Sequence, residues 1–99
     1  MAHVHVNEND WNKLSKEDQE RITGIMRSTG LIKHSDHLVG APAPLARAAK
    51  FAAANPTCML GCNAAEAAAV AACQLIPPPG NAICVAVAHT AADYCRGQC

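Results

Sequence analysis

The chain has 99 residues with 8 basic and 8 acidic side chains, so its formal charge at pH 7 is zero. This balance argues against a nucleic-acid-binding protein, which normally carries an excess of Lys and Arg, and we expect no nucleic-acid partner. Hydrophobic residues make up 51% of the chain but aromatic residues only 3%. Alanine is the commonest apolar residue and buries little area, so we expect a thin core that needs another source of stability.

The first half of the chain predicts an amphipathic helix. Residues 3–6 alternate His and Val, which is compatible with a short strand, but the main element is a helix over residues 9–29. Its apolar positions recur at helical spacing, and charges of both signs occupy the opposite face. The expected capping residues are Asn9 or Asp10 at the start, Ser15 in a capping-box-like sequence, and Gly30 at the end.

The second half predicts further helices separated by proline. We expect an N-terminal charged helical segment (1–40), a linker (41–44) that reads Ala-Pro-Ala-Pro, and a cysteine-containing helical bundle (45–99). Prolines disfavour continuation of a helix, so Pro77-Pro78-Pro79-Gly80 marks a turn. The helices expected in the bundle cover residues 45–54, 57–76 and 81–95.

The six cysteines have a mirror-related spacing, C-x3-C-x10-C-x10-C-x10-C-x3-C, whose centre falls in the proline turn. On each of two helices the three cysteines fall within about 60° of rotation, on one face. Six cysteines allow about 15 pairings. An antiparallel helical hairpin favours the nested one: Cys58–Cys99, Cys62–Cys95 and Cys73–Cys84.

The cysteines have two possible states other than disulfides. In a reducing compartment they would be free buried thiols. Alternatively, four reduced cysteines could bind zinc: Cys58, Cys62, Cys95 and Cys99. Disulfides imply an oxidising compartment, and because the first residues lack the pattern of a signal peptide, we expect export by another route.

The histidines are candidate metal ligands in two pairs, His3 with His5 and His34 with His37. Neither pair is combined with a C-x2-C motif, so zinc-finger spacing is absent. We expect no cofactor. His89 and Asp93 are four residues apart and could share a helix face, but no pattern of an active site is present and we expect no enzyme.

Residues 58–92 contain Glu66 as their only charged side chain. A hairpin this poor in charge is compatible with action at a membrane, although alanine gives little energy of insertion. The alternative is a hairpin packed against the amphipathic helix through Trp11, Ile22, Ile25 and Met26.

The paired C-x3-C motifs resemble those of α-hairpinin peptides and of the twin C-x3-C proteins of the mitochondrial intermembrane space. That resemblance implies the pairs Cys58–Cys99 and Cys62–Cys95, whereas the inner pair and the proline turn depart from it. A charged N-terminal segment before an Ala-rich and cysteine-rich helical segment is also similar to precursors of cysteine-rich bacteriocins and modified peptides. This second resemblance implies a leader (1–40) and a released product (45–99).

The sequence thus predicts an all-α fold, with an N-terminal amphipathic helix and an antiparallel Ala-rich hairpin with nested disulfides. The leading functional hypothesis is an exported cysteine-rich peptide or its precursor, bacteriocin-like or toxin-like and membrane-active. Its expected partners are a target membrane and processing or export machinery that binds residues 1–40. The alternatives are a non-catalytic binding module (a chaperone, adaptor or inhibitor) and a metal-binding protein.

Overall fold

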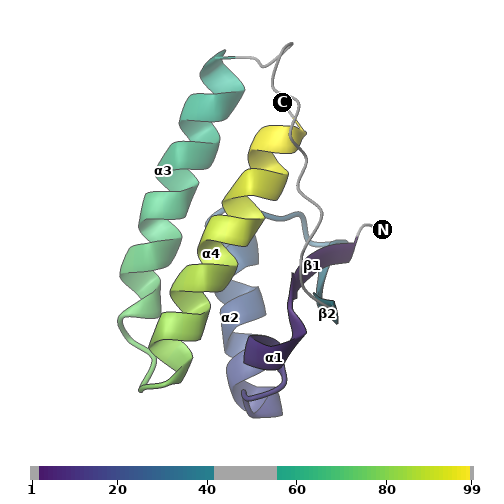
Figure 1. Cartoon of the computed structure of the whole chain (residues 1–99). Coiled ribbons are helices and arrows are strands. Elements are labelled where there is room, and N and C mark those ends of the chain that lie inside the picture. Colours follow the sequence, from purple (N-terminus) through teal and green to yellow (C-terminus); the bar gives the residue numbers. More distant parts are fainter. Residues whose placement is uncertain (1–2, 42–55, 99) are drawn as a thin grey trace.

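The computed structural model describes residues 3–41 and 56–98. Two long helices lie side by side, and a smaller unit of two helices and two strands packs against them (Figure 1). The elements in chain order are β1 (His3–Asn7), α1 (Glu8–Trp11), α2 (Lys16–Ser28), β2 (His37–Ala41), α3 (Pro56–Cys73) and α4 (Gly80–Gly97).

The two strands correct the expectation of an all-α fold. β1 and β2 form a parallel two-stranded sheet in which His3 pairs with His37 and Asn7 with Ala41. The alternating His and Val residues of β1 place Val4 and Val6 in the core, as strand geometry requires. β2 was not predicted, and its last residue, Ala41, belongs to the expected linker.

The helix expected over residues 9–29 is two helices separated at residues 12–15. Asn7, rather than Asn9 or Asp10, caps α1, because its side chain accepts hydrogen bonds from the backbone N–H groups of both. Ser15 caps α2 as predicted, accepting from the N–H of Asp18 at 3.2 Å. The second cap therefore begins a new helix instead of lying inside a longer one.

Gly30 ends α2 in the predicted manner. Its φ angle is +88°, which glycine adopts without a steric penalty. The N–H of Gly30 donates to the carbonyl of Arg27 and the N–H of Leu31 to that of Met26, the paired bonds of a Schellman motif. Leu31 is buried, so the chain turns back onto the core at this point.

The helices α3 and α4 agree closely with the predicted segments 57–76 and 81–95. They are joined through the proline-containing turn and pack against each other more extensively than any other pair of elements. Figure 1 shows them side by side, with the connection at one end of the pair. The helix expected over residues 45–54 and residues 42–44 of the expected linker lie outside the described residues.

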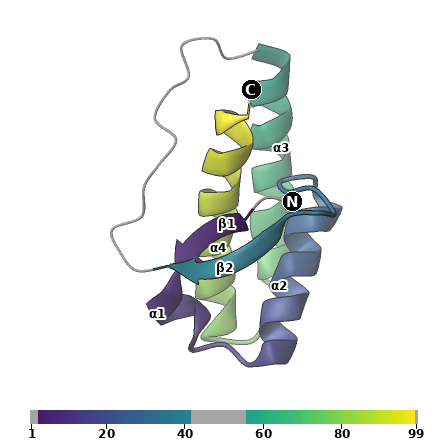
Figure 2. The ribbon, with the colours of Figure 1, turned by 90° about the vertical axis from the view of Figure 1, so that its right-hand side faces the viewer.

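One hydrophobic cluster contains side chains from both halves of the chain. Ile22 and Met26 of α2 are fully buried in it, and so are Ala88 and Ala91 of α4. The helix α2 contacts both α3 and α4, and β1 contacts α4. The N-terminal unit (residues 3–41) therefore packs on the helical pair (residues 56–98) through a shared core (Figure 2).

Candidate functional site

Two disulfides join α3 to α4, as the cysteine spacing predicted. Cys73 is bonded to Cys84 beside the turn, and Cys62 is bonded to Cys95 farther along the helices. The Cα–Cα distances are 5.5 Å and 5.8 Å respectively, within the normal range for disulfides. The third predicted pair includes Cys99, which lies outside the described residues.

Small side chains allow the two helices to approach to disulfide distance. Ala69, Ala88 and Ala91 are fully buried, and Ala65 packs against the same cluster. A larger side chain at such positions would force the backbones apart. The alanine content thus explains both the thin core and the close helix pair.

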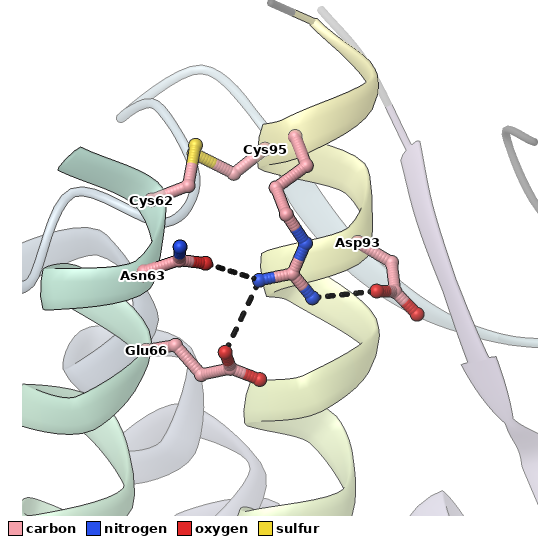
Figure 3. Close-up of a disulfide and its surroundings, with 6 residues drawn as sticks. Cys62, Asn63, Glu66, Asp93 and Cys95 are labelled. Atoms are coloured by element: carbon pink, nitrogen blue, oxygen red, sulfur yellow. Dashed lines mark hydrogen bonds and ion pairs between the residues drawn. A yellow bond between two sulfur atoms is a disulfide. The ribbon is translucent and has the colours of Figure 1, made fainter. Parts of the chain in front are cut away.

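A polar cluster lies beside the Cys62–Cys95 disulfide and links α3 to α4 (Figure 3). Arg96 donates hydrogen bonds to Asn63 at 2.9 Å, to Glu66 at 3.1 Å and to Asp93 at 2.6 Å. Nδ1 of His89 lies 2.7 Å from the other carboxylate oxygen of Glu66. One guanidinium group therefore joins groups from both helices.

The charges in this cluster shift each other's protonation. Partial burial opposes ionisation of Glu66, but hydrogen bonds from His89 and Arg96 outweigh it and lower the pKa of Glu66 below its usual 4.5. The hydrogen bond to Asp93 raises the pKa of Arg96 above its ordinary value, against the opposing effect of burial. The pair suggested by the sequence, His89 and Asp93, belongs to this cluster, but His89 contacts Glu66 and Asp93 contacts Arg96. Glu66 and Arg96 are 30 residues apart, so no local pattern indicated them.

A second surface feature is the outer face of α3, which is exposed and uncharged. Leu60 and Leu75 are 70% and 85% exposed, which is unusual for leucine. Leu60 lies in α3, whereas Leu75 lies in the turn two residues beyond its last residue, Cys73. Four exposed alanines of α3 lie within about 80° of Leu60 around the helix axis: Ala64, Ala67, Ala68 and Ala71. We call these six residues the α3 face.

The candidate metal ligands are exposed and do not converge. His3 and His37 lie opposite each other in the sheet with their ring centroids 6.3 Å apart. His5 is exposed two residues farther along the same face of β1, and His34 is exposed in the turn before β2. Arg27 lies 3.3 Å from Nδ1 of His37. Because a guanidinium can only donate, this nitrogen accepts and has no free lone pair for a metal ion. Across residues 3–41 and 56–98, no three His, Cys, Asp or Glu side chains are grouped closely enough to hold a metal ion.

Neither of the long helices meets the requirements for a membrane span: within the described residues, no helix combines enough length with enough apolar character.

Comparisons with protein-family models, with curated proteins and with solved structures found no match to this chain. Function must therefore be inferred from the contacts and surfaces described above.

Proposed function

We propose that this chain is a non-enzymatic, disulfide-stabilised helical binding protein of an oxidising compartment. The observation that supports it best is the core shared by the N-terminal unit and the helical pair. Ile22 and Met26 are completely covered in this core, so separation of the two parts would expose them to water at a cost of about 1.5–3 kcal/mol each. A chain built in this way functions with both parts joined.

The disulfides support the proposed compartment. Structural disulfides persist in secreted or other oxidising environments and are rare where thiols are kept reduced. Two bonds between the same pair of helices hold them at a fixed separation, so α3 presents a rigid surface. In this proposal the α3 face is the surface that contacts a partner, because an exposed apolar patch is typical of interaction sites.

Intact mass spectrometry of the protein from its producing cells tests this proposal. We expect a single species that retains residues 3–41 together with the helical pair, and whose mass rises on reduction as the disulfides open. A mature species that begins near residues 40–44 would overturn the proposal, because the N-terminal unit would then be a removed leader.

A second candidate function is a precursor of an exported, bacteriocin-like peptide that acts on membranes. The specific observation in its favour is that all six cysteines lie in residues 58–99, so the helices would stay covalently joined after loss of the N-terminal unit. That loss would also uncover Ile83 and Val87 of α4, which are now buried. In this case the N-terminal unit would both be recognised by processing or export machinery and mask an apolar surface.

Vesicle leakage distinguishes the second candidate from the first. The oxidised chain is cut at a protease site placed at residues 41–44 and applied to vesicles of phosphatidylcholine alone or with phosphatidylglycerol. The precursor hypothesis predicts leakage after the cut and none before it. If the helical pair, separated from the N-terminal unit after the cut, leaves both kinds of vesicle intact, the membrane hypothesis is wrong.

A further inference from the structure

A groove runs between α2 and β2 on the N-terminal unit, away from the α3 face. It has a volume of about 540 Å³, and its lining includes Trp11 and Leu38 as well as polar side chains of α2. Trp11 and Leu38 are themselves mostly buried, so they form an apolar base beneath a polar rim. Figure 2 shows β2 crossing in front of the molecule with α1 and α2 near it.

The rim of the groove is electropositive. Lys16 and Arg27 lie on it, with Glu20 as the only carboxylate among the lining residues. Neither cation forms an ion pair with a carboxylate in the described parts of the chain. Arg27 instead donates to the backbone carbonyl of Asp36 at 2.9 Å, and its Nε atom is buried without a hydrogen-bond partner. Two cations without carboxylate partners favour an anionic ligand.

The strand beside this groove has an open edge. Within residues 3–41 and 56–98, β2 pairs with β1 only, so its other edge has backbone groups without a strand partner. An extended peptide can bind such an edge by continuing the sheet, with backbone hydrogen bonds supplying affinity and side-chain contacts supplying selectivity. An open edge, an apolar base and a basic rim therefore occur together at one place.

We propose that this groove binds an extended peptide segment with acidic side chains, which adds to β2 as a third strand. Its backbone pairs with the open edge of β2, its carboxylates bind Lys16 and Arg27, and its apolar side chains cover Trp11. The site lies wholly within the N-terminal unit and is independent of the α3 face. A peptide-binding site here is consistent with both candidate functions. In a binding protein it would hold the partner, and in a precursor it would hold a segment of the processing machinery.

The test is a selection of random heptapeptides displayed on phage, carried out on the full oxidised chain. The groove variant is Lys16→Gln/Arg27→Gln. Its matched control is Lys13→Gln/Arg21→Gln, which makes the same change of charge at residues that do not line the groove. Synthetic copies of the selected peptides, chosen without tryptophan, are then titrated against all three proteins. Trp11 is the only tryptophan in the chain, so its fluorescence reports occupancy of the groove directly.

We expect the selected peptides to be rich in Asp and Glu and to change the emission of Trp11. Binding should weaken about tenfold or more in the groove variant and stay the same in the control, as loss of charge-assisted hydrogen bonds implies. If Arg27→Gln disturbs the fold, Lys16→Gln alone should still weaken binding, because Lys16 is exposed. N-methylation of alternate peptide nitrogens should abolish binding, as expected for a paired strand.

Three results would overturn the proposal. One is a selection that yields no enriched peptide or yields peptides without acidic residues. Another is equal binding to the groove variant and its control. The third is bound peptide that leaves amide hydrogen exchange in β2 (His37–Ala41) unchanged, since a third strand would protect those amides.

Discussion

Gly30 and Gly24 lie in the same part of the chain but under different constraints. Gly30 has a φ of +88°, where a side chain is strained, whereas Gly24 lies inside α2 with nothing within 4 Å of an added Cβ atom. Residue identity at the first position is dictated by backbone geometry. At the second, glycine only weakens a helix that alanine would favour.

The two glycines therefore predict opposite effects of the same substitution. Gly30→Ala should lower the free energy of unfolding by about 1 kcal/mol, because the Cβ atom of alanine is sterically unfavourable at positive φ. Gly24→Ala should raise it by about 0.5–1 kcal/mol through helix propensity. Urea denaturation of the oxidised proteins measures both. A gain of stability in Gly30→Ala would show that α2 does not end as described.

The lowered pKa of Glu66 predicts that the free energy of unfolding depends on pH. Its pKa is lowered in the folded chain, so its ionised form contributes stability above the usual value of 4.5. This contribution is lost as the pH falls through the lower, folded-state pKa. The stability advantage of the native chain over Glu66→Gln should therefore be largest near neutral pH and shrink below about pH 4.5.

Urea unfolding of both proteins between about pH 6 and pH 3 measures this difference. Glu20→Gln is the control, because its carboxylate contacts neither Arg96 nor His89 in the described structure. Parallel stability curves for the native chain and Glu66→Gln would contradict the interpretation of the cluster.

Among the elements, local signals in the sequence located α2, α3 and α4, but they did not separate α1 from α2 and did not indicate β2. Ser15 and Gly30 predicted the ends of α2 because a cap is decided by one or two residues. β2 was missed because a strand of five residues containing Gly40 and Ala41 has little intrinsic preference. It forms because β1 offers a pairing partner, which no local pattern reveals.

The cysteine spacing was informative for a different reason. Disulfides join distant residues, so a mirror-related spacing about a proline turn encodes long-range contacts directly in the sequence. The pairs Cys62–Cys95 and Cys73–Cys84 follow from it. The groove on the N-terminal unit had no such signal, because Trp11, Lys16 and Leu38 come together only through the unpredicted position of β2.

Removing either disulfide should destabilise the helical pair. Cys62→Ala/Cys95→Ala and Cys73→Ala/Cys84→Ala should each lower the free energy of unfolding by about 3 kcal/mol, because an open loop has more conformational entropy when unfolded. Cys73 and Cys84 are also fully buried, so their replacement adds a cavity. Thermal and urea unfolding measure both effects. Stability equal to that of the native chain would show that the bonds do not constrain the fold.

At the scale of the whole molecule, the shared core decides how the two parts behave. The side chain of Met26 is completely buried where α2 meets the helical pair, while that of Leu75 projects into solvent. Met26→Ala should therefore cost about 2–5 kcal/mol, whereas Leu75→Ala should stay within about 0.5 kcal/mol. Urea denaturation provides the measurement. A small effect at Met26 would mean that the two parts scarcely support each other.

Urea unfolding of the oxidised chain, followed by two probes at once, tests the shared core directly. Trp11 fluorescence reports on the N-terminal unit, and far-ultraviolet circular dichroism reports mainly on α3 and α4, which have 18 residues each. A shared core predicts that both signals change in one transition with the same midpoint. If Trp11 becomes exposed at a lower urea concentration while most helical signal remains, the two parts fold separately and the shared core does not join them.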